Sequence, residues 1–317
     1  MKLRPLGRSG IEVAPLAFGG NVFGWTVDEP SAFRLLDTFT GNGFNLVDTA
    51  DVYSKWAPGN SGGESETVIG HWIALGGGRR EKIVLATKVG MLGTRAGLSA
   101  ANIEAAVNDS LRRLKTDYID VYFSHIDDAA TPLEETLDAY QKLVKAGKVR
   151  VIGASNYTGE RVAEALAVSK EAGLPAYQVL QPEYNLYNRE GYETDIEPVA
   201  QAHKLAVVTY FSLASGFLSG KYRSKADTEQ AARGSRVEKY MNDRGFRIID
   251  ALVDVARRND TTPATVALAW IIARPSVTAP IASATSVAQL ESLAAATRLA
   301  LPPEDLAALD EASAASK

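Results

Sequence analysis

Leu46-Val47-Asp48-Thr49-Ala50-Asp51-Val52-Tyr53 begins as a short apolar run and ends in polar residues. Runs of this kind, rich in β-branched residues and each followed by a helical pattern, begin near Ala14, Leu46, Ile83, Ile119, Val149, Tyr177, Ala206 and Thr278. Most of the intervals between them are about 28 to 37 residues long, which is the length of one strand-plus-helix unit. Eight alternating units predict an α/β fold in which eight parallel strands close into a (β/α)8 TIM barrel.

Three segments fall outside the eightfold repeat. Residues 3–13, with two glycines at a turn, predict an N-terminal hairpin that closes the bottom of the barrel. A polar, basic stretch at residues 215–247 predicts a long loop after strand seven, and residues 303–312 predict an extra C-terminal helix. Within the repeat, the hydroxyl of Thr131, followed by a proline and a glutamate, is expected to cap a helix. No linker divides the chain, so residues 1–317 are expected to form a single domain.

The composition favours a soluble, cytoplasmic protein without metal or disulfide chemistry. Apolar residues make up 46% of the 317 residues, the formal net charge is −4, and there is no cysteine. Lys and Arg are scattered, so we expect no nucleic-acid or membrane-surface partner. His71 and His203 have no carboxylate at metal-ligand spacing, which makes a metal site unexpected. Neither an apolar leader nor a stretch long enough to span a membrane is found.

Four residues at predicted strand ends form a set suited to acid–base chemistry. Asp48 closes the second strand, Tyr53 follows it, Lys88 ends the third strand and His125 ends the fourth. The carboxyl ends of barrel strands carry functional side chains, so these four should meet. A phenol has a pKa near ~10, and we expect the ammonium of Lys88 to lower it so that Tyr53 can act as an acid. Asp48 would balance the charge of Lys88, and a neutral His125 would orient a carbonyl oxygen.

The sequence contexts of these residues are similar to those of a known enzyme family. Lys88 ends Leu85-Ala86-Thr87-Lys88, and His125 ends Val121-Tyr122-Phe123-Ser124-His125. Together with the segment from Leu46 to Tyr53, they resemble the three motifs of the aldo-keto reductase superfamily, and the resemblance covers nearly the whole chain. It implies that Asp48, Tyr53, Lys88 and His125 are catalytic. Taken singly, each residue has an ordinary alternative as a cap, a core residue, a solvated charge or a structural histidine.

The resemblance also implies a nicotinamide cofactor held by barrel loops, because no G-x-G-x-x-G motif opens a strand–helix unit. Ser155, Asn156 and Gln181 would bind the carboxamide, and Tyr210 would stack on the nicotinamide ring. The loop after Tyr210, with Lys221, would meet the pyrophosphate, and Arg236 would fold over the cofactor. A core aromatic is the alternative for Tyr210, and a solvated surface arginine is the alternative for Arg236. The implied cofactor contacts are Gly20, Asn21, Asp48, Ser155, Asn156, Gln181, Tyr210, Phe211, Ser212, Leu213, Ala214, Gly216, Leu218, Lys221, Arg236, Ile281, Ala282, Ser283, Thr285 and Gln289.

The loop that ends strand eight lacks a basic residue. In relatives this loop holds the adenosine 2′-phosphate, often with a Lys or Arg. Here Ser283, Thr285 and Gln289 occupy those places, and Leu293 falls where an asparagine usually reads the adenine. Hydroxyls, an amide and a helix N-terminus can still bind a phosphate. The resemblance therefore favours NADP(H), with NAD(H) possible.

The resemblance implies an NADP(H)-dependent oxidoreductase that reduces an aldehyde or ketone to an alcohol. A hydride would come from nicotinamide C4, and Tyr53 would donate the proton. The alternative is an NAD(P)-dependent sugar or alcohol dehydrogenase on the same site, and a third interpretation is a nucleotide-sensing regulatory subunit. Phe23, Trp25 and Trp56, in loops near Tyr53, are expected to contact a small apolar or aromatic substrate, with loop packing as the alternative. Neither the physiological substrate nor the oligomeric state follows from the sequence.

Overall fold

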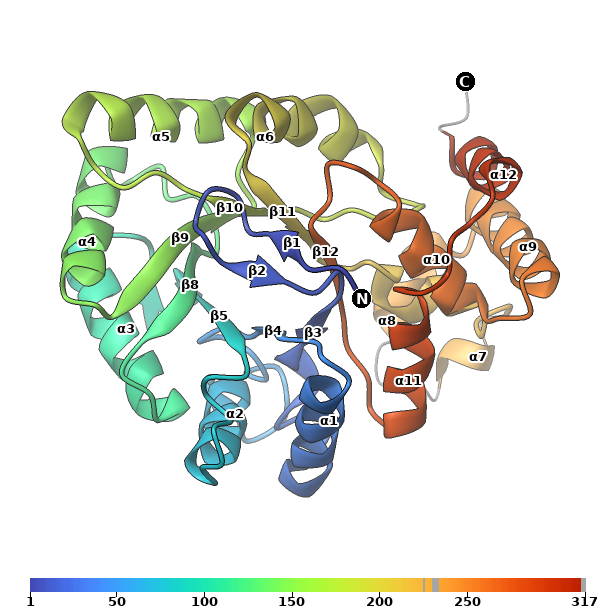
Figure 1. The fold of residues 1–317 in the computed structure, drawn as a ribbon, viewed down its shortest axis with the longest axis horizontal. Helices are drawn as coiled ribbons and strands as arrows, with labels where there is room; N and C mark the ends of the chain where they lie inside the picture. Colours follow the sequence, from blue (N-terminus) through green and yellow to red (C-terminus); the bar gives the residue numbers. More distant parts are fainter. Residues whose placement is uncertain (225, 230–233, 315–317) are drawn as a thin grey trace.

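Eight parallel strands close into a barrel in the computed structural model, which describes residues 1–224, 226–229 and 234–314 (Figure 1). In chain order the barrel strands are β3 (Ala17–Gly19), β4 (Leu46–Asp48), β5 (Val84–Val89), β8 (Ile119–Ser124), β9 (Val149–Ser155), β10 (Val179–Gln181), β11 (Ala206–Thr209) and β12 (Ala279–Ala282). Neighbours in the barrel are neighbours in this order, and β12 pairs with β3 to close it. Each strand begins within a few residues of its predicted start. The predicted (β/α)8 TIM barrel is confirmed.

Helices alternate with the strands and cover the outside of the barrel (Figure 1). They are α1 (Glu29–Gly41), α2 (Glu64–Ala74), α3 (Ala100–Leu114), α4 (Leu133–Lys145), α5 (Gly159–Ala172), α6 (Glu197–His203), α7 (Ala226–Glu229), α8 (Gly234–Val237), α9 (Asp243–Arg258), α10 (Pro263–Ile272), α11 (Val287–Ala295) and α12 (Pro303–Ser313). Shorter helical segments lie at Gly20–Val22, Ala214–Ser219 and Glu238–Tyr240, and a π-helical turn lies at Tyr192–Ile196. Several helices begin at a side-chain cap, as where Asp28 accepts from the Ser31 N–H before α1.

A hairpin of β1 (Arg4–Pro5) and β2 (Glu12–Val13) lies across one end of the barrel (Figure 1). Its apolar side chains belong to the same buried cluster as the inward-facing residues of the barrel strands. The turn requires glycine at Gly7, where φ is +63° and a Cβ would lie 2.6 Å from the carbonyl oxygen of Gln178. The predicted hairpin is therefore confirmed. A second hairpin, β6 (Met91–Leu92) with β7 (Arg95–Ala96), follows β5 at the opposite end.

The segment after β11 is long, as predicted, but it ends before residue 247. Residues 225 and 230–233 of that stretch lie outside the described residues. The described part contains α7, α8 and the short helix Glu238–Tyr240, and α9 already begins at Asp243. Asn242 caps α9 by accepting from the Gly245 N–H at 3.0 Å. Arg244 and Arg247, which the prediction included in the loop, therefore lie in an amphipathic helix whose apolar side is buried. The predicted C-terminal helix is α12.

The cap expected at Thr131 is not formed. Its hydroxyl donates to Oδ2 of Asp128 at 2.7 Å, and α4 begins at Leu133, after Pro132. The same Asp128 oxygen accepts from the Leu98 N–H at 2.7 Å, so Thr131 helps to order the loop between β8 and α4 instead of the helix terminus.

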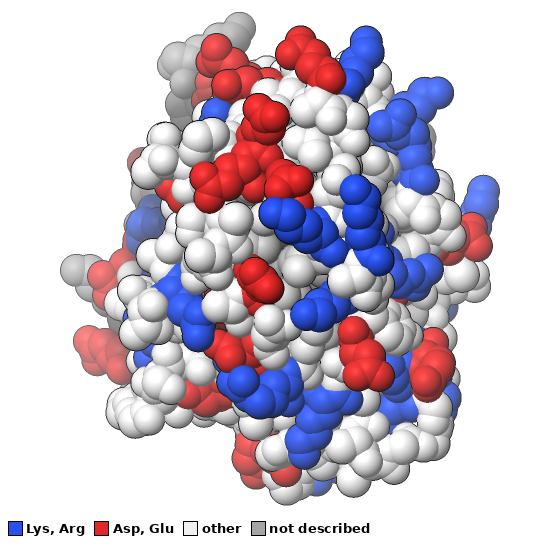
Figure 2. Space-filling view, turned by 90° about the vertical axis from the view of Figure 1, so that its left-hand side faces the viewer, with Lys and Arg blue, Asp and Glu red and all other residues white. Residues whose placement is uncertain are grey.

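Charged side chains of both signs are mixed on the surface. Figure 2 shows basic and acidic residues interspersed on the side of the molecule seen there, as expected for a chain with a formal net charge of −4. In the part of the chain that is described, no helix has the length and apolar character needed to cross a membrane. Within the same residues, no group of three or more His, Cys, Asp or Glu side chains is arranged to hold a metal ion.

Candidate active site

The four residues predicted to be catalytic, here called the tetrad, lie together at the carboxyl end of the barrel. Asp48 is the last residue of β4, Lys88 lies near the end of β5, and His125 follows β8. Tyr53 stands in the turn after β4. Because β4, β5 and β8 are adjacent in the barrel, their ends converge. Asp48, Lys88 and His125 are all buried.

Lys88 is the centre of this group. Its Nζ donates to both carboxylate oxygens of Asp48, each at 2.8 Å, and to the backbone carbonyl of Thr49 at 2.8 Å. It also donates to Oη of Tyr53 at 2.9 Å, and Tyr53 Oη donates to Oδ2 of Asp48 at 3.3 Å. A fully buried ammonium is thus paired with a carboxylate and holds the phenolic oxygen in place.

The phenol of Tyr53 is harder to ionise than its place beside Lys88 predicts. Burial, followed by the carboxylate of Asp48, raises the pKa of Tyr53 well above the ordinary value of 10.0. The expected lowering by Lys88 is therefore wrong, because Asp48 offsets the ammonium charge and burial disfavours the phenolate. Burial also lowers the pKa of Lys88, an effect that Asp48 opposes. Tyr53 is protonated at neutral pH, which is the form that a proton donor needs.

His125 is neutral beside the phenol. Burial, and then the charge of Lys88, lower the pKa of His125 well below 6.5. The centroids of the His125 and Tyr53 rings are 6.1 Å apart, and the rings meet edge to face at 71°. Nδ1 of His125 is buried and has no hydrogen-bond partner within the described residues. A buried polar atom of this kind is available to a polar atom of a ligand.

The residues predicted to bind the nicotinamide carboxamide adjoin the tetrad. Nε2 of Gln181 donates to Oδ1 of Asp48 at 2.8 Å, and the Ser155 hydroxyl donates to the backbone carbonyl of Gln181 at 2.8 Å. Nδ2 of Asn156 donates to the backbone carbonyl of His125 at 2.8 Å. Oδ1 of Asn156 accepts from the Tyr210 hydroxyl at 2.7 Å. The structure therefore brings together the predicted residues at the ends of β9, β10 and β11.

The segment after β11, predicted to meet a pyrophosphate, has an unusual backbone. Phe211, Ala214 and Ser215 have φ values of 50°, 48° and 59°, in the left-handed region that residues with a side chain rarely adopt. Gly216 in the same segment has φ of 101°. The side chains of Ser212, Ala214 and Leu218 are buried, whereas Leu213 is partly exposed and Lys221 is exposed. The buried residues can offer a cofactor only their backbone groups.

The loop from β12 to α11 is held in shape by hydrogen bonds among its own polar residues. Oε1 of Gln289 accepts from the N–H of Thr285 at 2.9 Å and from the Thr285 hydroxyl at 3.0 Å. Ser286 caps α11 by accepting from the Gln289 N–H at 3.3 Å. The Ser283 hydroxyl donates to Oδ1 of Asn21 at 2.6 Å, which joins this loop to the one after β3. The predicted cofactor residues on this side of the barrel are Gly20, Asn21, Ile281, Ala282, Ser283, Thr285 and Gln289.

The comparisons with known proteins identify the family. A family profile described as "Aldo/keto reductase family" matches residues 15–314. The chain belongs to this family. It is 36% identical to "Uncharacterized oxidoreductase YrpG" of Bacillus subtilis, over 98% of this chain and 95% of the relative. It is 32% identical to "Protein tas" of Escherichia coli, over 98% and 97%. It is 33% identical to "Probable voltage-gated potassium channel subunit beta" of Arabidopsis thaliana, over 92% and 89%. Family membership makes the chain an oxidoreductase.

In this aldo/keto reductase, Arg236 lies over the aromatic residues beside the tetrad. Its Cζ is 5.4 Å from the ring centroid of Trp56 and 5.9 Å from that of Trp25. The two indoles meet edge to face at 5.7 Å, and Trp56 is 6.1 Å from the Tyr53 ring. A guanidinium over aromatic faces is a favourable contact. Arg236 is itself exposed, and its contact with the two indoles brings the segment that carries α8 beside the aromatic residues next to the tetrad.

Phe23 is not available to a substrate. Its side chain is fully buried and stacks on Phe18, with 5.2 Å between ring centroids. Phe18 in turn packs against Phe39 of α1, so Phe23 belongs to the layer between the barrel and the helices. The prediction that Phe23 contacts the substrate is wrong.

Two exposed apolar side chains at the barrel mouth were not predicted from the sequence, where only their positions just after Lys88 and His125 could have indicated them. Met91 follows Lys88 closely and is 43% exposed, and Ile126 directly follows His125 and is 40% exposed. Trp56 is exposed to a similar extent. Large apolar side chains that remain exposed at strand ends next to buried polar groups are typical of a substrate rim.

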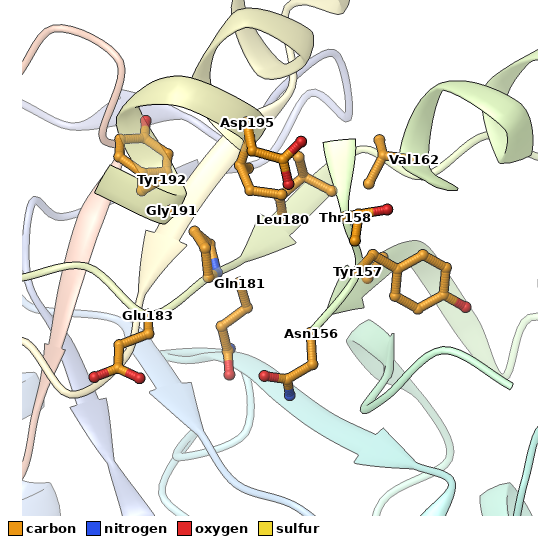
Figure 3. A pocket seen from close by; sticks show the side chains of 13 residues that line it. Asn156, Tyr157, Thr158, Val162, Leu180, Gln181, Glu183, Gly191, Tyr192 and Asp195 are labelled. Carbon is orange, nitrogen blue, oxygen red and sulfur yellow. The ribbon is translucent and has the colours of Figure 1, made fainter. Parts of the chain in front are cut away.

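A cavity of about 320 Å³ opens beside the predicted carboxamide-binding residues. Figure 3 shows Asn156, Gln181 and Glu183 along one side of it, and Asp195 and Tyr192 of the π-helical turn on the other. Because it shares Asn156 and Gln181 with the predicted nicotinamide site, the cavity adjoins that site.

Proposed function

We propose that this aldo/keto reductase reduces an aldehyde or ketone to an alcohol with NADP(H), and that Tyr53 donates the proton. The observation that carries this proposal is the contact between Nζ of Lys88 and Oη of Tyr53 at 2.9 Å, with Asp48 as the counter-ion of the ammonium. A phenol in contact with a buried ammonium can give up its proton, because the ammonium already donates a hydrogen bond to the oxygen that becomes the phenolate. A bound nicotinamide cofactor supplies the hydride from its C4.

Three residues of the tetrad have separate roles in the proposed proton transfer. Tyr53 holds the proton, because burial keeps the phenol protonated at neutral pH. Lys88 stabilises the phenolate that forms when the proton leaves. His125, being neutral, offers a hydrogen bond from its imidazole that orients the carbonyl oxygen and stabilises the negative charge that develops on it.

The residues around the tetrad fit a nicotinamide dinucleotide. Ser155, Asn156 and Gln181 offer a hydroxyl and two amides for a carboxamide, and Tyr210 offers a partly exposed ring for stacking. Backbone N–H groups in the left-handed segment around Ser215 can bind phosphate oxygens. Lys221 and Arg236 add positive charge on that side, and the N-terminus of α11 suits the 2′-phosphate.

The substrate that we propose is a small carbonyl compound with an apolar or aromatic substituent. Trp56 stands next to Tyr53, Trp25 packs against Trp56, and Met91 and Ile126 extend the apolar rim. An apolar substituent that covers such a rim is favoured by about 25 cal/mol per Å² of apolar surface removed from water.

Two other functions have a specific observation in their favour. The neutral phosphate loop, in which Ser283, Thr285 and Gln289 replace a basic residue, favours use of NAD(H) and hence an NAD(P)-dependent sugar or alcohol dehydrogenase. Similarity to a protein named as a probable potassium channel subunit beta favours a nucleotide-sensing regulatory role. Because all four residues of the tetrad are present, we favour an enzyme over a nucleotide sensor.

The test is a panel of aldehydes, ketones, sugars and alcohols, assayed with NADPH, NADH, NADP and NAD. We expect the highest kcat/KM with an apolar or aromatic carbonyl and NADPH. A clear preference for alcohol oxidation with NAD would establish the dehydrogenase. Tight binding of NADPH or NADH, with no oxidation of the bound cofactor by any carbonyl compound, would establish the nucleotide-sensing role.

A further inference from the structure

Asp51 is a buried carboxyl group beside the tetrad. It lies in the turn between Asp48 and Tyr53, its side chain is 1% exposed, and its backbone N–H donates to the carbonyl of Lys88 at 3.4 Å. Within the described residues, neither oxygen of its carboxyl group forms a hydrogen bond of normal geometry, and the neighbouring Val52 N–H favours the ionised form only weakly. An ionised carboxylate is strongly disfavoured in such surroundings, so a buried acid without a partner tends to keep its proton.

The charged and titratable groups that face Asp51 come from five elements. They are Lys88 on β5, Glu66 on α2, Arg113 on α3, Tyr122 on β8 and Tyr140 on α4. Glu66 is fully buried; its Oε2 accepts from Nε of Arg113 at 2.7 Å, and its Oε1 accepts from the Thr87 hydroxyl at 2.5 Å. Glu66 is therefore fully engaged, and its negative charge disfavours a second one on Asp51.

This cluster contains more acids than bases. Lys88 is bonded to Asp48, and Arg113 is bonded to Glu66, which leaves Asp51 without a base of its own. One retained proton makes the cluster electrically neutral, and Asp51 is the group that holds it. Burial, and then the charge of Glu66, raise the pKa of Asp51 to about 7. Asp51 therefore changes charge near neutral pH.

We propose that Asp51 is a positioning residue that acts through Lys88, and that its charge determines how readily the Lys88–Tyr53 pair gives up a proton. The proposal rests on the proposed function of Tyr53 as proton donor. Ionisation breaks the O–H bond of the Asp51 carboxyl group and passes the proton to solvent. The new negative charge makes loss of a proton from either Lys88 or Tyr53 less favourable. Tyr53 is then a weaker acid, and carbonyl reduction slows as the pH rises through neutrality.

The first experiment needs no turnover. Wild-type protein labelled with carboxyl-¹³C aspartate is titrated by NMR, and Asp51→Asn identifies the Asp51 signal. We expect one aspartate signal to titrate near pH 7 in the wild type and to be absent from Asp51→Asn. In Lys88→Met the midpoint should move up by about one pH unit, because the ammonium that favours the ionised form is gone. Lys142→Met, which removes an exposed lysine of α4, should leave the midpoint in place.

The second experiment measures hydride transfer in a single turnover with NADPH and the best carbonyl, from pH 5 to pH 10. The wild type should show a fall in rate centred near pH 7 and a second fall at alkaline pH. Asp51→Asn should lose the first fall, and its alkaline fall should begin about one pH unit lower. A residue that served only packing would change the rate at all pH values without removing an inflection. Asp138→Asn, the same substitution at an exposed site of α4, should behave as the wild type.

The outcomes separate this proposal from the proposed function. An Asp51 signal that stays ionised from pH 5 to pH 9, or a midpoint unmoved in Lys88→Met, overturns the role of Asp51. That role is also overturned if Asp51→Asn turns over with an unchanged pH profile. If Asp51 titrates near pH 7 and shifts in Lys88→Met but no carbonyl is reduced, the proposed function fails while the coupling of Asp51 to Lys88 is supported.

Discussion

Tyr53 has one hydroxyl group, and the proposed reaction uses it directly. Tyr53→Phe keeps the ring beside Trp56 but removes the proton that would reach the carbonyl oxygen. We expect kcat to fall by roughly 10²- to 10⁴-fold, the usual contribution of general acid catalysis, while the Kd for NADPH changes little. Stopped-flow assays and fluorescence titration measure the two quantities. Tyr118→Phe, just before β8, is the matched control. Near wild-type reduction by Tyr53→Phe would remove Tyr53 as the proton donor.

Lys88 is the only cation in direct contact with Tyr53 within the described residues, and it is also the counter-ion of Asp48. Lys88→Met should lower kcat across the pH range, because the phenolate loses its hydrogen bond. It should also destabilise the fold by about 3–5 kcal/mol, since Asp48 becomes an unpaired buried charge. Urea unfolding and steady-state kinetics test both effects. A Lys88→Met protein as stable and as active as the wild type would contradict the geometry described for this pair.

At the scale of elements, the loop between β12 and α11 is expected to control cofactor choice. A charge-assisted hydrogen bond contributes roughly 1.5–3 kcal/mol, against 0.5–1.5 kcal/mol for a neutral one. NADPH should therefore be preferred only modestly over NADH. Ser283→Lys or Gln289→Arg should tighten NADPH binding selectively, and added salt should reduce the gain.

Quenching of tryptophan fluorescence gives both dissociation constants for these variants. Gln201→Arg, an exposed glutamine on α6, is the control for a non-specific effect of added positive charge. Equal tightening of NADPH and NADH would mean that this loop does not contact the 2′-phosphate, and the NAD(P)-dependent dehydrogenase would become the better proposal.

Strand positions could be predicted from the sequence because a buried parallel strand is a short, continuous apolar run. The starts of β4, β8, β9 and β11 coincide with the expected residues. The direction of a loop side chain leaves no such trace, which is why Phe23 was expected at the mouth and lies in the core. Thr131 has the chemistry of a cap, but the nearby Asp128 binds its hydroxyl instead. Which of two possible partners a hydroxyl binds depends on tertiary contacts.

The tetrad could be predicted as a group, whereas the pKa of Tyr53 could not. The sign of each charge follows from the sequence, but its burial and the sum of its neighbours do not. Once Asp48 offsets Lys88, desolvation decides the direction. Asp51 shows the same limit. Its carboxyl group is buried without a hydrogen bond of normal geometry among the described residues, and this is a property of the folded chain that the sequence does not reveal.

For the whole molecule, Asp51 makes stability depend on pH. Its folded pKa of about 7 lies above the value of about 3.9 in an unfolded chain. The folded state therefore holds a proton that the unfolded state has lost, and the wild type loses stability as the pH rises from about 4 to about 7. Relative to the wild type, Asp51→Asn should gain about 2.5 kcal/mol of unfolding free energy between pH 5 and pH 8. Urea unfolding at both pH values measures this gain, and a constant difference would show that Asp51 is ionised throughout.

The hairpin that closes the barrel also links its first strand to the segment just before the last barrel strand. The guanidinium of Arg4 donates to the carbonyl of Ile272 at 2.8 Å and to that of Val277 at 2.9 Å. During synthesis on the ribosome, Arg4 emerges long before these acceptors, which are made just before the last barrel strand. A nascent chain halted before Ile272 lacks both acceptors, and because it also lacks β12 it cannot close the barrel. These contacts between distant parts of the sequence are therefore formed late, and until then the apolar side of the hairpin stays uncovered.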